Sequence, residues 1–298
     1  MSHTPLRYTQ NFLRDPRLVE RLLAASSISR DDLVYEIGPG AGILTDGLAR
    51  QAQRVVAIEL DAALAETLRR RYASNPRVEV HTGDFLEYAL PQQPYKVFAN
   101  IPFAYTHEIV TRLTSAACPP QDAYLIMQRE AAEKFRGGQR EYLYAVLLKP
   151  WFMLEITHQF RCGDFTPAPS VEVVMLRIQK RGPPLITADE RQMFRDFAVY
   201  GFTARQPTFD PILRGILSHR QRREAMRLCG IEPGATPSTI AFSQWIDLFH
   251  YVARVASLQA RQTIAGSERR LRRQQADLRK LHRTRKPGAW RDQARLET

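Results

Sequence analysis

The chain has 298 residues, 44% of them hydrophobic, and a formal net charge of +12 at pH 7, which suits a large domain with a buried core and a smaller second domain. Its three cysteines are far apart and odd in number, and its seven histidines have no ligand spacing, so we expect neither a disulfide framework nor a metal site. The longest apolar run, at residues 143–148, is too short to cross a bilayer, and residues 1–10 hold no apolar signal segment. These features predict a cytoplasmic protein that spans no membrane.

The first half of the chain alternates between strand and helix patterns. Apolar strand-like runs occur at residues 33–37, 54–58, 77–81, 95–99 and 123–128. Helical spacing occurs at residues 18–23, after the start signal Asp15-Pro16, and at 43–52, 62–72 and 106–116. This alternation predicts a doubly wound, mostly parallel sheet. Two further extended segments, 151–160 and 171–178, are expected to add an antiparallel hairpin at its edge, which makes seven strands.

The pattern becomes helical after the boundary signal Gly182-Pro183-Pro184. Helices are expected at residues 188–204, 211–229 and 242–256. We therefore divide the chain into an α/β domain (1–182), a small helical domain (183–256) and a basic tail (257–298). Arginines at 220, 222 and 223 lie on one expected helix, where they could form a solvated face or contact phosphates.

Most of the positive charge lies in the tail. Residues 1–250 carry 30 basic and 27 acidic side chains, whereas residues 251–298 carry 13 and 4. Such a surplus suggests a polyanionic partner, either nucleic acid or an acidic membrane surface. Ile264, Leu271 and Leu278 are seven residues apart with arginines between them, which fits a basic amphipathic helix or a solvated, partly disordered tail equally well.

A glycine-rich turn follows the first strand of the expected sheet. Residues 36–42 read E-I-G-P-G-A-G, and glycines such as Gly38 and Gly40 let a ligand approach the backbone closely. A turn of this kind is weak evidence for a ligand site by itself, because ordinary tight turns use the same residues. Glu36 is more informative, since an acid just before the turn suits the ammonium group of an amino acid better than a pyrophosphate.

Two more acids end the following strands. Glu59, about twenty residues after the turn, stands where an acid can accept both ribose hydroxyls, although alone it would be an ordinary acid at a helix start. Asp84 closes the third strand, where it can accept the exocyclic amine of adenine, with Phe85 beside the ring. A ligand with an ammonium group, a ribose and an adenine is S-adenosylmethionine, so the three acids in this order predict that methyl donor.

The segment N-I-P-F at residues 100–103 has the groups needed to hold an amine for methylation. An exocyclic amine on an aromatic base is a poor nucleophile, because its lone pair is delocalised into the ring. The side-chain oxygen of Asn100 and the carbonyl of Ile101 can accept both amine hydrogens, and Phe103 can stack on a flipped base. Positioning and electrostatics then supply most of the effect without a strong base. An Asn-x-Pro turn that merely ends a strand is the alternative.

These motifs resemble the rRNA adenine N6-methyltransferase superfamily, and most closely its Erm (erythromycin-resistance) branch, over residues 8 to about 255. The opening motif of the family, Q-N-F-L, lies at residues 10–13, and N-I-P-F has the Erm-like spelling. Residues 165–171, F-T-P-A-P-S-V, match the F-x-P-x-P-x-V segment of the family. Residues 244–249, Q-W-I-D-L-F, are similar to the closing segment of Erm proteins. The arginine-rich tail is similar to that of members from actinobacterial antibiotic producers.

The resemblance implies a Rossmann-like class I methyltransferase fold with a small C-terminal helical domain that binds rRNA, acting as a monomer. It implies that the donor site includes Gln10, Asn11, Leu13, Glu36, Gly38, Gly40, Glu59, Asp84, Phe85 and Asn100. Phe103 and Phe165 would hold the adenine beside Asn100. The implied reaction is N6 methylation of an adenine in the peptidyl-transferase region of 23S rRNA, which would give resistance to macrolides, lincosamides and streptogramin B.

Several alternatives stay open. Tyr105 and His107-Glu108 stand where relatives often have Thr or Ser and Asp, which leaves the number of methyl groups undecided. Phe165 could be a core aromatic between prolines. A 16S rRNA adenine dimethyltransferase of the small subunit usually has Leu and Tyr in place of Ile101 and Phe103. A nonenzymatic RNA-binding factor would not need the three acids together, and a DNA adenine methyltransferase usually has a second proline in place of Ile101.

Overall fold

The structure is a computed structural model that describes residues 11–284, with side chains up to residue 276. The chain forms two compact units. One consists of the residues up to Gly138 together with Leu148–Leu185, and the other of Gln139–Leu147 together with the residues from Ile186 onward. The second unit thus includes a short stretch that precedes the last two strands of the sheet, and Glu141 N donates to Ser238 O at 2.8 Å within it.

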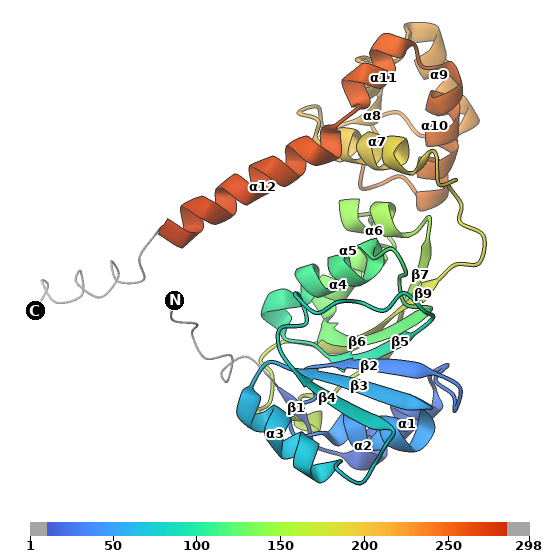
Figure 1. Ribbon diagram of the computed structural model, residues 1–298. Helices are drawn as coiled ribbons and strands as arrows, with labels where there is room; N and C mark the ends of the chain where they lie inside the picture. Colours follow the sequence, from blue (N-terminus) through green and yellow to red (C-terminus); the bar gives the residue numbers. More distant parts are fainter. Residues whose placement is uncertain (1–10, 285–298) are drawn as a thin grey trace, which may run out of the picture. The chain divides into compact units, whose positions relative to one another are not determined.

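A seven-stranded sheet forms the centre of the first unit (Figure 1). In spatial order the strands are β4 (Val78–Thr82), β3 (Arg54–Glu59), β2 (Leu33–Ile37), β5 (Lys96–Asn100), β6 (Asp122–Gln128), β9 (Val173–Lys180) and β7 (Phe152–Gln159). The strands from β4 to β6 are parallel, and β9 is antiparallel to both of its neighbours. The predicted doubly wound sheet with an antiparallel hairpin at one edge is confirmed.

Helices cover both faces of this sheet (Figure 1). On one face lie α1 (Pro16–Ala24), α2 (Ile43–Gln51) and α3 (Ala62–Arg71), and on the other α4 (Thr106–Ser115) and α5 (Arg129–Arg136). The start signal Asp15-Pro16 acts as expected, because Asp15 accepts from Arg17 N at 2.9 Å before a proline in the first turn. Asp61, which was not predicted as a cap, caps α3 through Ala63 N and Leu64 N. The short helix α5 was not predicted.

The core of the first unit lies between α1, α2 and the sheet. Val34, Leu48, Val55 and Phe98 are fully buried there, and Leu13 from the start of the described chain joins the same cluster. Burying each such side chain contributes roughly 1.5–3 kcal/mol. This core therefore fixes the strands whose ends carry the sequence motifs.

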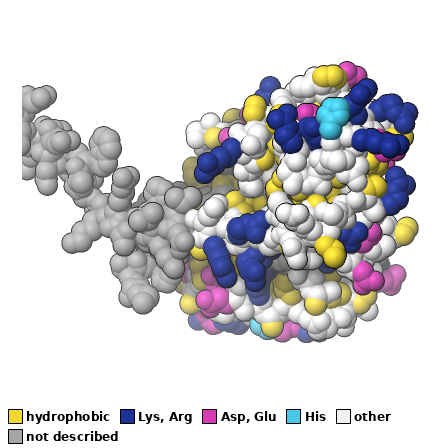
Figure 2. Space-filling view, turned by 90° about the horizontal axis from the view of Figure 1, so that it is seen from above, with side chains coloured by type: hydrophobic (Ala, Val, Ile, Leu, Met, Phe, Trp, Pro, Cys, Tyr) yellow, Lys and Arg dark blue, Asp and Glu magenta, His cyan; other side chains and the backbone are white. Residues whose placement is uncertain are grey.

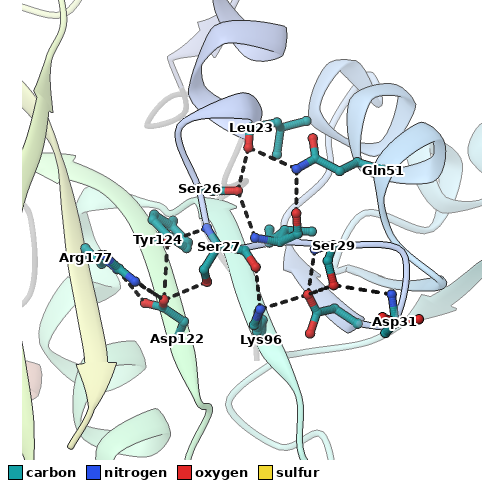
Figure 3. Close-up of polar contacts among 12 residues, drawn as sticks. Leu23, Ser26, Ser27, Ser29, Asp31, Gln51, Lys96, Asp122, Tyr124 and Arg177 are labelled. Carbon is teal, nitrogen blue, oxygen red and sulfur yellow. Dashed lines mark hydrogen bonds and ion pairs between the residues drawn. The ribbon is translucent and has the colours of Figure 1, made fainter.

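A polar network fastens the loop after α1 to the sheet (Figure 3). Asp122 at the start of β6 is 2% exposed and accepts from Arg177 at 2.6 Å and from Ser27 Oγ at 2.7 Å. Lys96 at the start of β5 donates to Ser27 O at 2.5 Å and to Asp32 at 2.8 Å. Because these groups lie where the parallel strands begin, the network stabilises the edge opposite the motifs.

A second, two-stranded sheet was not expected. Strand β1 (Phe12–Leu13) pairs antiparallel with β8 (Phe165–Thr166), with Leu13 opposite Phe165. Arg14 N also donates to Asp164 O at 3.0 Å. The pairing joins the opening motif to the F-x-P-x-P-x-V segment, which lies about half the chain away.

The second unit is helical. Its helices are α7 (Arg191–Thr203), α8 (Phe209–Leu213), α9 (His219–Leu228), α10 (Phe242–Val255), α11 (Leu258–Ile264) and α12 (Ser267–Thr284), with most of α6 (Leu143–Leu148). Trp245 of α10 is fully buried at its centre, stacked on Phe202 with ring centroids 5.1 Å apart. Aromatic packing of this kind explains why the segment at residues 242–256 forms a helix in contact with α7.

Two expectations for this unit were wrong. The single helix at residues 211–229 is two helices, because Ser218 forms a capping box with Gln221 and starts α9 anew. Arg222 is not part of a solvated basic face, since it is 6% exposed and its Nη1 lies 2.9 Å from Asp210 Oδ2. Arg220 and Arg223 are exposed.

No helix among the described residues is both long and apolar enough to cross a membrane. In the same part of the chain, His, Cys, Asp and Glu side chains form no group that could hold a metal ion.

Candidate active site

The sequence motifs meet at one edge of the sheet. Glu36 and Glu59 lie at the carboxyl ends of β2 and β3, Asp84 follows β4, and Asn100 ends β5. Strand β2 has β3 on one side and β5 on the other, so the chain reverses its winding direction there. Ligands of open α/β sheets bind outside the carboxyl ends of the strands at such a switch point.

The turn after β2 depends on glycine at three positions. Gly38, Gly40 and Gly42 have φ angles of 66°, 57° and 87°, which L side chains rarely adopt. The turn also packs closely: a Cβ on Gly40 would lie 2.5 Å from Cε1 of Phe12. Gly38 N donates to Ile58 O at 2.9 Å, which ties the turn to β3. Glycine is thus favoured at this turn because of its positive φ angles and because a side chain would collide with its neighbours.

Glu36 is a buried acid with half of its hydrogen-bonding capacity unused. It is fully buried, and its Oε2 accepts from Thr45 Oγ1 at 2.7 Å. Its Oε1 has no hydrogen-bond partner among the described residues. Burial, reinforced by the nearby charges of Glu59 and Asp46, raises the pKa of Glu36 to about 8. A cation beside Oε1 would complete this site and bring the carboxyl back to its ionised form.

Glu59 is held in place by backbone amides. It is 3% exposed, and its Oε2 accepts from Gly40 N at 3.0 Å while its Oε1 accepts from Asp61 N at 3.0 Å. One acid therefore fixes both the glycine turn and the start of α3. Each carboxylate oxygen keeps a further lone pair with which it could accept a hydroxyl.

Asp84 is in a more open position. It is exposed, and its Oδ1 accepts from Leu86 N at 2.8 Å. Gly83 N donates to Glu59 O at 2.8 Å, so the loop that carries Asp84 is attached to the end of β3. Phe85 is 5% exposed, so its side chain is buried within the protein.

The side-chain amide of Asn100 is oriented by the opening motif. Its Nδ2 donates to Asn11 O at 2.6 Å, and since a carbonyl can only accept, the amide nitrogen must face Asn11. Oδ1 is then directed elsewhere as an acceptor. Ile101 N donates to Ile126 O at 3.2 Å, and a single 3-10 turn, η2 (Phe103–Tyr105), follows. The loop is thus fixed on both sides of the asparagine.

The two aromatic residues expected at the base differ in their surroundings. Phe103 is partly buried against the core of the first unit. Phe165 is 2% exposed, faces Leu13 in the small sheet, and lies 5.3 Å from Phe160 between ring centroids. Phe165 has the environment of a core residue, and its contact with a base stays a prediction.

The structure brings most of the expected donor-site residues to one edge, but not all of them can be assessed. Gln10 lies outside the described residues. Asn11 and Leu13 reach the site through the β1–β8 pairing, which sequence reasoning missed. Thr45, which bonds Glu36, was also missed, because a single threonine inside an amphipathic helix gives no local signal.

The residues fit S-adenosylmethionine. The unpartnered Oε1 of Glu36 suits its ammonium group, Glu59 suits ribose hydroxyls, and Asp84 suits the adenine amine. The glycine turn lets the donor approach the backbone between them. When bound, S-adenosylmethionine supplies an electrophilic methyl group.

Comparisons with known proteins identify the family of this chain. The sequence model of the family described as ribosomal RNA adenine dimethylase matches residues 1–254. An rRNA methyltransferase of Streptomyces thermotolerans is 35% identical over 246 residues, 80% of each chain. A ribosomal RNA small subunit methyltransferase A of Geobacter metallireducens is 32% identical over 257 residues, which cover 80% of this chain and 92% of that one.

Among solved structures, the crystal structure of the 23S rRNA methyltransferase ErmE matches with a TM-score of 0.77 at 28% identity, covering 82% of this chain and 100% of that one. The family match spans both the α/β unit and the helices up to α10. The chain belongs to the ribosomal RNA adenine dimethylase family and is an S-adenosylmethionine-dependent rRNA adenine N6-methyltransferase.

Proposed function

We propose that the substrate is 23S rRNA, that the methylated adenine lies in its peptidyl-transferase region, and that the product gives resistance to macrolides, lincosamides and streptogramin B. The observation that carries this proposal is the N-I-P-F loop at residues 100–103, which has the Erm-like spelling and whose asparagine is oriented by Asn11. The similarity to ErmE supports it.

In this proposal the loop prepares the amine for attack. Oδ1 of Asn100 and the carbonyl of Ile101 accept the two amine hydrogens, which draws the nitrogen toward tetrahedral geometry and directs its lone pair at the methyl group. Phe103 stacks on the flipped adenine. Glu36, Glu59 and Asp84 hold the ends of the donor. Removing one such positioned hydrogen-bonding group typically costs 10²- to 10³-fold in rate.

The second unit is proposed to bind rRNA. Figure 2 shows Lys and Arg side chains distributed over one face of the described molecule, with acidic side chains among them. Of the three arginines expected on α9, only the exposed Arg220 and Arg223 remain candidates for phosphate contacts, because Arg222 is paired with Asp210. Phosphate contacts position a protein on RNA without reading its sequence.

A 16S rRNA adenine dimethyltransferase is the second candidate. It is favoured by the similarity to small subunit methyltransferases A, such as the relative from Geobacter metallireducens at 32% identity. The two candidates differ in their target RNA and agree on the chemistry and on the donor site.

Primer extension with mass spectrometry of the stalled region, on 23S and 16S rRNA incubated with protein and S-adenosylmethionine, tests the proposal. We expect N6-methylated adenine in the 23S peptidyl-transferase loop, absent with Asn100→Ala, and the mass gives the number of methyl groups. Modification of adenines near the 16S 3′ end alone would instead establish the second candidate.

A further inference from the structure

The basic segment beyond α10 is joined to α7 of the second unit by a buried polar network. The match to the family model ends at residue 254, and α11 and α12 follow. Asp196 of α7 is 5% exposed, and its two oxygens accept from Gly266 N at 3.0 Å and Glu268 N at 2.9 Å. A carboxylate on these amides satisfies donors at the start of α12 and complements its positive end.

Glu268 forms the second half of this network, and we call the contacts of Asp196 and Glu268 together the anchor. It is 7% exposed and accepts two hydrogen bonds from Arg195, at 2.7 and 3.0 Å, with further bonds from Gln192 and Arg272. Burial would raise the pKa of Glu268, but the hydrogen bonds and charges of the arginines lower it to about 2. The carboxylate is therefore ionised throughout the physiological range, and the anchor persists.

The anchor explains how α12 can form from an arginine-rich sequence. A first helical turn is costly to form, and Asp196 and Arg195 of α7 fix it from outside the helix through the Gly266 and Glu268 amides and the Glu268 carboxylate. Arg269 and Arg273 lie one turn apart on the same side, and like charges at this spacing repel each other by roughly 0.2–0.5 kcal/mol. Both are exposed, and neither has an acidic partner among the side chains that the structure describes.

We propose that α12 is an anchored RNA-binding helix, on which Arg269 and Arg273 contact phosphates of the rRNA backbone. A polyanion relieves the repulsion between the two guanidinium groups, and its counterions are released on binding. The proposal requires rRNA as substrate, which the family membership gives, and holds for either target RNA because backbone contacts carry no sequence information.

The test is the salt dependence of RNA affinity. Fluorescence anisotropy titrations of the full chain, at several KCl concentrations, would use labelled fragments of the 23S peptidyl-transferase loop and of the 16S 3′ end. For R269Q/R273Q we expect a weaker Kd and a log–log slope shallower by roughly 1.4 to 1.8, which corresponds to two lost phosphate contacts. The change should be equal on the two fragments, whichever of them the enzyme methylates.

Two further variants keep the result interpretable. R30Q/R77Q removes the same charge from exposed positions that precede β2 and β4, at the sheet edge opposite the motifs, and should keep the wild-type slope. R269K/R273K should restore the slope, because the slope counts neutralised phosphates and lysine neutralises a phosphate as arginine does. A wild-type slope in R269Q/R273Q, an equal loss in R30Q/R77Q, or no rescue by lysine would each overturn the proposal.

Discussion

The ring of Phe12 lies directly against the backbone of Gly40, so that a methyl group on this glycine would be 2.5 Å from Cε1 of Phe12. The contact joins the opening motif to the glycine turn. Since the neighbouring Asn11 orients Asn100, the position of β1 couples the donor turn to the loop that carries the reaction.

Gly40→Ala should therefore damage both stability and donor binding. The alanine would have to adopt a φ of +57° and displace Phe12, and a left-handed residue alone costs roughly 1–2 kcal/mol. We expect a lower Tm and at least a tenfold weaker affinity for S-adenosylmethionine by titration calorimetry. Gly182→Ala is the matched control, because a methyl group added there would meet no heavy atom of the described residues within 4 Å. Equal donor affinity in the two variants would contradict the coupling.

Glu36 should make the stability of the ligand-free protein depend on pH. Its pKa rises from 4.5 to about 8 on folding, mainly through burial. Between these values the unfolded chain has released the proton that the folded chain keeps, so stability falls as pH rises, by about 3 kcal/mol in total at pH 7. Below pH 4.5 both states are protonated and this effect vanishes. Urea unfolding from pH 5 to 8 measures it.

Glu36→Gln should flatten this pH dependence and make the ligand-free protein more stable at pH 8, because the amide keeps an acceptor for Thr45 without a buried charge. The same variant should bind S-adenosylmethionine more weakly, since no carboxylate remains for the ammonium group. Exposed Glu87→Gln is the control and should change neither property. Stability of Glu36→Gln that follows the wild-type pH curve would refute the assignment.

The parts of the fold that followed from sequence are those set by local chemistry. Strand periods, the cap Asp15 and the glycine turn each depend on residues within a few positions of one another. The β1–β8 pairing and the contact of Phe12 with Gly40 join distant segments, and no local pattern specifies them. The Ser218 capping box, by contrast, was a readable signal that the expected helix at residues 211–229 should have been divided.

The order of the acids predicted which residues gather at the sheet edge, because parallel strands place their carboxyl ends together. The hydrogen-bond partners of these acids could not be predicted in the same way. Glu36 and Glu59 are both buried acids, yet Glu59 is satisfied by two backbone amides while Glu36 keeps an unpartnered oxygen. That difference depends on the three-dimensional path of the turn, which cannot be predicted from the spacing of the residues in the sequence.

Asn100→Ala should remove catalysis while leaving the donor bound. Its Oδ1 is oriented by the bond from Nδ2 to Asn11 O, so the alanine loses the acceptor for the amine. We expect a 10²- to 10³-fold lower single-turnover rate of methyl transfer, with S-adenosylmethionine affinity changed less than tenfold. Asn100→Asp should be equally slow, because a carboxylate cannot donate to the Asn11 carbonyl. A near-normal rate in Asn100→Asp would show that this orientation is not required.

The roles of Phe103 and Phe165 can be distinguished by replacing each residue with leucine. Phe165 is 2% exposed and packs on Phe160, so Phe165→Leu should act as a core substitution that lowers stability by about 1–2 kcal/mol and changes activity of the folded enzyme little. Phe103→Leu should lower stability less than Phe165→Leu does, because Phe103 is only partly buried, and it should raise KM for RNA, because it loses a stacking face worth about 1–3 kcal/mol per base. Thermal melts and RNA-dependent kinetics measure both effects. If folded Phe165→Leu instead raises KM for RNA at unchanged donor affinity, then Phe165 leaves its core position to hold the adenine, as the family resemblance implies.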